Sequence, residues 1–216
     1  MSIVSSRSAE DVLAAIEAAD RFVIQQVFKP IANEYRISIP ASGSSAEGEP
    51  LLFVKQKKMK IKEDIRFRLD PDRDEHLFMI KSKSVFEFAG RHDVLAADGS
   101  AIGLLEKNFG ASLLRSHWRV YGPDGAGELF NAQEKSLVIA IIRRFSGIVS
   151  DGLVALLQWL PFDFVLRRNG EDTGHYHRVL GQFRDRYVLE LRPGAAGIDR
   201  RLVLAFAVAL DALQDR

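Results

Sequence analysis

The sequence predicts a mainly β protein in which a closed antiparallel β-barrel encloses a C-terminal hydrophobic α-helix. Three observations lead to this fold class: an apolar stretch near the C-terminus, strands with alternating apolar and polar residues, and repeated hairpin turns. Residues 202–210 carry no polar side chain, so a helix there has to be buried on every side. Such a helix is roughly 13 Å long, far short of a hydrocarbon core of about 30 Å. The rest of the chain must therefore surround it.

A short surface helix is expected over residues 8–19, because Ser8 is suited to cap it and acidic residues follow in the first turn. β-Branched and aromatic residues then predict two strands between residues 22 and 39. The polar segment 40–50, rich in serine and glycine, predicts an exposed loop.

These elements divide the chain into an N-terminal helical segment, residues 1–21, and a barrel domain, residues 22–216, with a central helix over 198–214. Four charged residues flank the apolar stretch, and we expect the helix to emerge from the two barrel mouths at Asp199, Arg200, Arg201 and Asp211.

Alternation of period two between residues 51 and 69 indicates strands with one apolar and one basic face. Apolar residues, Phe53 and Phe67 among them, share odd positions. Basic residues share even positions, namely Lys58, Lys60, Lys62, Arg66 and Arg68. The segment 76–88 reverses the parity and adds Lys81 and Lys83 to the polar side. This basic face is a candidate surface for anionic lipid headgroups. The alternative is a solvated outer wall, neutralised by the neighbouring residues Glu63, Asp64, Asp70, Asp72 and Asp74.

Hairpin turns are predicted at Asp98-Gly99 and Asn169-Gly170, because these residue pairs tolerate the positive φ of a type I′ turn. In both hairpins a second glycine, Gly103 or Gly174, follows four residues after the first. A shortened third copy carries Asp124-Gly125. This weak repeat favours a meander of antiparallel strands, whose closure into a barrel would remove exposed edges.

Residues 136–160 are apolar but interrupted by Arg143, Arg144 and glycines, and periodicity does not separate strand from helix there. The interruptions keep every apolar run below the length of a transmembrane helix. The part containing Trp159 is suited either to a membrane interface or to packing on the barrel.

Composition narrows the functional classes. The net charge of +1 provides no general attraction to nucleic acid, and the absence of cysteine excludes thiolate metal sites, disulfides and cysteine nucleophiles. The N-terminus lacks the basic start and apolar run of a secretory signal, which favours a cytoplasmic protein, in contact with membranes at most peripherally.

Several segments in a fixed order, residues 48–63, 86–94, 110–120 and 199–205, resemble the LURP-one-related family, which is grouped with tubby C-terminal-like domains and phospholipid scramblases. The resemblance implies a barrel of twelve antiparallel strands around a central helix. Tubby domains bind phosphoinositide headgroups through basic residues, and scramblases are linked to lipid movement and calcium. The acidic calcium-binding segment of scramblases is not evident before the last helix here, where 192–200 offers only Asp199.

No catalytic constellation is recognisable. His175 and His177 would share one face of a strand, but two ligands are too few for a metal site and a solvent-facing pair is the preferred interpretation. The glycine pairs are better explained by turns than by phosphate binding, and no nucleotide, hydrolase or metalloprotease motif occurs. We therefore expect neither a cofactor nor a bound metal.

The sequence leads to three functional hypotheses. The first is a non-enzymatic binding module that meets an anionic membrane surface, or an unidentified protein, through its basic face. The second is a scramblase-like lipid transporter. The third is a structural or adaptor protein without lipid contact.

Overall fold

The structure is a computed structural model that describes residues 7–27, 34–41, 44–58, 63–82, 90–108, 117–135, 163–179 and 185–213. Lys60, Lys62, Lys83 and the segment 136–160, all considered above, lie outside the described residues. The side chain of Lys58 is also outside them, although its backbone ends a strand.

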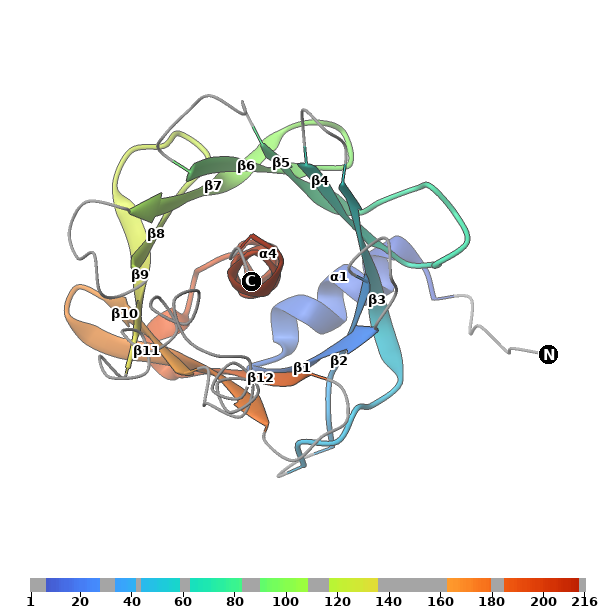
Figure 1. Ribbon diagram of the computed structural model, residues 1–216, viewed down its shortest axis with the longest axis horizontal. Helices are drawn as coiled ribbons and strands as arrows, with labels where there is room; N and C mark the ends of the chain where they lie inside the picture. Colours follow the sequence, from blue (N-terminus) through green and yellow to red (C-terminus); the bar gives the residue numbers. More distant parts are fainter. Residues whose placement is uncertain are drawn as a thin grey trace, which may run out of the picture.

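Twelve antiparallel strands of the described chain close into one barrel, in which sequence neighbours pair and β1 pairs with β12 (Figure 1). The strands are β1 (Arg21–Val27), β2 (Glu34–Ser38), β3 (Pro50–Lys58), β4 (Glu63–Arg68), β5 (Phe78–Ser82), β6 (Gly90–Ala96), β7 (Ala101–Asn108), β8 (His117–Tyr121), β9 (Glu128–Glu134), β10 (Asp163–Arg168), β11 (Glu171–Val179) and β12 (Arg186–Leu191). This architecture confirms the predicted fold class.

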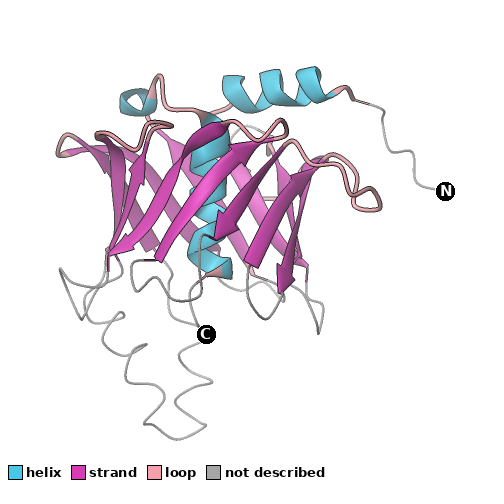
Figure 2. Ribbon diagram, turned by 90° about the horizontal axis from the view of Figure 1, so that it is seen from above, coloured by secondary structure: helices cyan, strands magenta, loops and turns pink. Residues whose placement is uncertain are grey.

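Within the described ranges, three helical elements accompany the barrel: α1 (Ala9–Ala18), a short 3₁₀ turn η2 (Pro193–Ala195) and α4 (Arg200–Ala212). Helix α1 begins as predicted, because Ser8 and Asp11 form a reciprocal capping box. It lies across one barrel mouth, as Figure 2 shows, and its buried residues Val12 and Ile16 belong to the same hydrophobic cluster as the barrel interior.

Helix α4 passes through the barrel, and every side chain from residue 202 to residue 210 is buried (Figures 1 and 2). Phe206 packs edge-on against Trp118, with ring centroids 6.3 Å apart, and against Phe130, at 5.5 Å. The helix begins at Arg200 rather than at residue 198 as predicted, because Asp199 caps it by accepting a hydrogen bond from the Arg201 backbone N–H.

The charged residue at the start of α4 is buried rather than emerging into solvent, which corrects the prediction for Arg200. Its guanidinium donates to the carbonyl oxygens of Ala19, Ala195 and Ile198 at 2.9–3.3 Å and pairs with Asp20 at 2.8 Å. These partners replace water around the buried cation. Arg200 therefore ties the start of α4 to the chain between α1 and β1.

Asp211, at the other end of α4, is also buried, contrary to the prediction. Its carboxylate accepts hydrogen bonds from the hydroxyls of Tyr35 at 2.8 Å and Tyr187 at 2.6 Å. Close by, the Gln56 side-chain amide donates to the Ala212 carbonyl oxygen at 3.3 Å. Polar groups of three different strands thus bind the last turn of the helix.

The hairpin predictions hold with two corrections. Both Asn169 (φ 53°) and Gly170 (φ 85°) have the positive φ of a type I′ turn, whereas at Asp98-Gly99 only the glycine does (φ 84°). The second glycine of the repeat serves close packing instead of turning. A Cβ on Gly103 would lie 2.5 Å from the Tyr121 carbonyl oxygen and 2.8 Å from Leu202.

Candidate functional site

Antiparallel pairing divides the strand ends between two barrel mouths (Figure 2). We call the end at which β3 ends at Lys58, β4 begins at Glu63 and β5 ends at Ser82 the lysine mouth. The opposite end, which α1 covers, is the α1 mouth. Helix α4 begins at the α1 mouth, where Arg200 pairs with Asp20, and ends at the lysine mouth beside Gln56.

The predicted basic face does not form one uniform surface, because the strand parity changes between β3 and β4. In β3 the side chains with at most 2% exposure occupy even positions, Leu52, Val54 and Gln56, whereas in β4 they are Ile65 and Phe67 at odd positions. The placement of Phe53 on the apolar inner face was therefore wrong. Two strands joined by a connection need not keep one parity, so a continuous alternation across residues 51–69 was a misleading signal.

Arg66 and Lys81 lie on the outer wall, on neighbouring strands. The Arg66 side chain is 25% exposed and pairs with Asp64 at 4.0 Å. Lys81 is exposed, lies opposite Asp64 in the register and makes no ion pair with the described residues. Lys55, which the prediction did not include, adds a further charge that pairs with Glu34 at 3.9 Å. Acidic and basic residues thus alternate across this wall.

Arg68 has a different environment from the other predicted residues. Its side chain is only 4% exposed, donates to the Arg73 carbonyl oxygen at 2.9 Å and pairs with Asp74 at 3.1 Å. A buried arginine whose guanidinium already binds a carbonyl oxygen and a carboxylate of the same chain is not available to a headgroup. Arg68 instead fixes the loop between β4 and β5, residues 69–77.

The two histidines of β11 share the outer wall, as predicted, but are only partly exposed. Their rings stack with centroids 4.8 Å apart, and His175 Nε2 contacts the Asp163 carboxylate. Burial, and then the neighbouring His175, lower the pKa of His177. No group of three or more metal-ligating side chains occurs within the described ranges.

His92 on β6 has a strongly lowered pKa. Its ring lies against Trp118, with centroids 6.3 Å apart, and burial, followed by the nearby Lys107, lowers the pKa of His92 from 6.5 to about 4. The imidazole is therefore neutral at physiological pH and contributes to the barrel interior as an aromatic ring rather than as a charge.

This pKa predicts a loss of stability in mild acid. As the pH falls from 6.5 to about 4, His92 takes up a proton in the unfolded chain but not in the folded one. The free energy of unfolding should fall over that window by up to about 3 kcal/mol relative to its value above pH 6.5. Urea unfolding of the wild type and of His92→Gln at several pH values checks this, since the variant should lose less stability across the window. Parallel pH profiles for the two proteins would contradict it.

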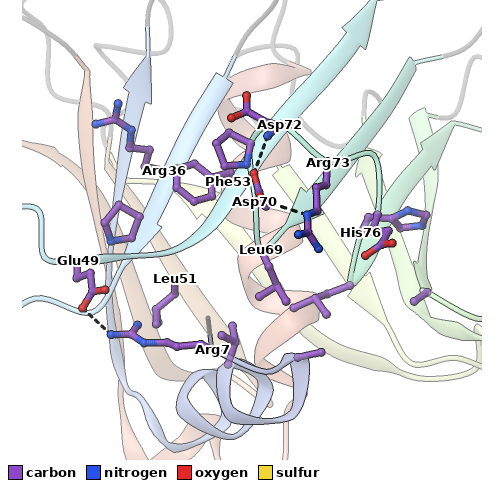
Figure 3. A pocket seen from close by; sticks show the side chains of 17 residues that line it. Arg7, Arg36, Glu49, Leu51, Phe53, Leu69, Asp70, Asp72, Arg73 and His76 are labelled. Atoms are coloured by element: carbon purple, nitrogen blue, oxygen red, sulfur yellow. Dashed lines mark hydrogen bonds and ion pairs between the residues drawn. The ribbon is translucent and has the colours of Figure 1, made fainter. Parts of the chain in front are cut away.

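A groove of about 1040 Å³ lies at the α1 mouth, between α1, the start of β3 and the 69–77 loop (Figure 3). Its apolar lining includes Leu51, Leu69 and Phe53, and charged residues surround them. Sequence reasoning missed this groove. The acidic residues of the loop were noted only as neutralising neighbours of the basic face, and no local pattern indicates that α1 packs beside them.

Closed antiparallel strands around an apolar C-terminal helix are the architecture of tubby-like domains. The LURP-one-related family model matches residues 51–211, and the chain belongs to this family. The match begins within β3, while β1 and β2, which precede it, complete the closed barrel. Comparison with curated proteins and with solved structures returned no match. Among the described residues, no helix has the length and apolar character needed to cross a membrane.

Proposed function

We propose that this protein is a non-enzymatic binding module that contacts anionic phospholipid headgroups through the basic residues of the lysine mouth. The observation that carries the proposal is the strand topology. It brings the end of β3, the start of β4 and the end of β5 to one mouth, so that Lys58 and Lys81 border connections containing Lys60, Lys62 and Lys83.

The distribution of ion pairs favours the mouth over the wall. Lys55, Arg66 and Arg68 each have an acidic partner at 3.1–4.0 Å, which reduces what they offer to a phosphate. Lys81, nearest the mouth, is exposed and without an ion pair in the described chain. Each basic residue near an anionic surface contributes about 1 kcal/mol, so several lysines are needed for measurable binding.

Membership of the LURP-one-related family is compatible with this proposal, but it specifies neither a ligand nor a binding surface. The proposal also assigns an orientation: the lysine mouth faces the membrane, and α1 with its groove faces away. Because the proposed attraction is electrostatic and Lys81 is exposed, added salt should weaken it.

The test is sedimentation with vesicles of phosphatidylcholine containing phosphatidylglycerol or phosphatidylinositol bisphosphate, and with vesicles of phosphatidylcholine alone. Wild type should pellet with the anionic vesicles only. The variant Lys58→Glu/Lys60→Glu/Lys62→Glu should bind at least about a hundredfold more weakly, because each reversal removes an attraction and adds a repulsion.

A matched control reverses three arginines at the other mouth that are exposed or half-buried, Arg73→Glu/Arg167→Glu/Arg192→Glu, with the same change in net charge. It should pellet like the wild type. Circular dichroism and melting temperature establish that all three proteins are folded. Equal pelleting of both variants, or negligible pelleting of the wild type, would refute the proposal.

A further inference from the structure

We propose that the groove at the α1 mouth is a docking site for a partner protein's segment that carries apolar side chains flanked by lysine or arginine. This inference is independent of the lipid proposal, because the groove lies at the opposite end of the barrel from the lysine mouth.

The floor of the groove provides the apolar half of the site. Leu51 is buried and points into the groove beside Leu69 (Figure 3). Leu69 and Leu77, which also belongs to the lining, are half-buried. Phe53 adds a half-buried aromatic ring from the outer face of β3. A volume of about 1040 Å³ matches that of sites that bury most of a sizeable ligand. Apolar side chains of a partner would replace water over this floor.

The arginines around the groove already have acidic partners. Arg7 pairs with Glu49 at 2.6 Å, across the gap between α1 and β3 (Figure 3). Arg73 pairs with Asp70 at 3.5 Å. The third arginine, Arg36, lies 3.7 Å from Glu47, which is outside the lining. An anionic ligand would therefore have to compete for cations that the protein has neutralised.

Two carboxylates of the rim, unlike these arginines, have no oppositely charged partner among the described residues. Asp72 and Glu75 are exposed, line the groove and make no ion pair with the described residues. With every arginine of the lining paired, the uncompensated charge of the groove is negative. Electrostatic complementarity then selects a partner that places cations beside Asp72 and Glu75.

The loop that carries both carboxylates is held in place before any partner arrives. The buried Arg68 binds the Arg73 carbonyl oxygen and the Asp74 carboxylate, and the Asp72 backbone N–H donates to Asp70 at 2.8 Å. A preorganised rim avoids part of the entropic cost of binding. The groove is partly open rather than enclosed, which suits a peptide segment better than a small molecule.

The test is selection of a random peptide library displayed on phage, using the immobilised full-length protein. The eluted pool is depleted on the variant Asp72→Lys/Glu75→Lys. Enriched peptides should contain apolar residues flanked by lysine or arginine. A synthetic copy of the dominant peptide, measured by fluorescence anisotropy, should bind Asp72→Lys/Glu75→Lys at least about tenfold more weakly than wild type. Phe53→Ser should also weaken it, through the floor.

The matched control Asp124→Lys/Glu171→Lys makes the same charge change in exposed turns elsewhere at this end of the barrel, and it should bind like wild type. Enriched peptides without basic residues, or binding unaffected by Asp72→Lys/Glu75→Lys, would overturn the proposal. Tighter binding of dodecylamine than of any peptide would assign the groove to small amphiphiles instead. A wild-type dimer in sedimentation velocity that Asp72→Lys/Glu75→Lys dissociates would assign it to a second copy of the chain.

Discussion

Replacing Phe206 by alanine is expected to lower the free energy of unfolding by about 3–5 kcal/mol. Phe206 is fully buried in the middle of α4, and its ring packs edge-on against Trp118 and Phe130 of the barrel wall. Its removal leaves a cavity between helix and strands that neither can close without disturbing the other. Urea unfolding followed by tryptophan fluorescence and circular dichroism measures the loss.

The same substitution at Phe53 is the control, because that ring is only half-buried on the outer face of β3. Phe53→Ala should lose clearly less stability, about 1 kcal/mol or below. Comparable losses at the two positions would contradict the central burial of α4.

The second large effect is expected from removing the Tyr35 and Tyr187 hydroxyls, which donate hydrogen bonds to Asp211. Tyr35→Phe/Tyr187→Phe keeps the two rings but removes from the buried carboxylate the hydroxyl donors at 2.8 and 2.6 Å. Hydrogen bonds to a charged group contribute about 1.5–3 kcal/mol each, so the double variant should lose about 3–6 kcal/mol. Equilibrium unfolding in urea is again the measurement.

Changing Asp211 itself separates this cause from loose packing. Asp211→Leu in the double-variant background should recover part of the stability, because an apolar group no longer needs donors. Tyr121→Phe, which removes the hydroxyl of a half-buried tyrosine of β8, should cost much less. A further loss of stability on adding Asp211→Leu would show that the double variant is not destabilised through the loss of hydrogen bonds to the Asp211 carboxylate.

The fold was largely predictable, because a few strong local signals constrain it. A stretch apolar on every side, residues 202–210, demands a surrounding wall, and turn signals such as Asn169-Gly170 demand antiparallel neighbours. Closure of the strands into a barrel follows, because it buries the apolar helix and leaves no strand edge exposed. The N-terminal helix was predictable for a similar reason, since Ser8 and Asp11 carry their capping information locally.

Features that depend on distant partners were less predictable. Arg200 and Asp211 were expected to emerge into solvent as ordinary helix-end charges, yet both are buried. Their compensating groups, Asp20 for Arg200 and the tyrosines for Asp211, come from strands and loops far away in the sequence. Arg68 is a similar case. The alternation predicts that it lies on a basic face, but this local pattern carries no information about the loop whose Asp74 pairs with it.

The two candidate sites differ in the same way: one has a local sequence signal, and the other depends on segments that are distant in the sequence. The richness of lysine between residues 57 and 62 is visible in the sequence, and the topology adds that the end of β5 with Lys81 lies at the same mouth. The groove at the α1 mouth has no sequence signature. It arises where α1 meets the 69–77 loop and the start of β3, and these segments are separated by tens of residues.

Hydrogen–deuterium exchange with and without phosphatidylglycerol vesicles tests the central claim most directly, because it locates the face of the barrel that meets the membrane. The account predicts protection in peptides that cover the end of β3 and the end of β5, including Lys58 and Lys81, and unchanged exchange in α1 and the 69–77 loop. Protection confined to the α1 mouth, or no change anywhere despite pelleting, would contradict it.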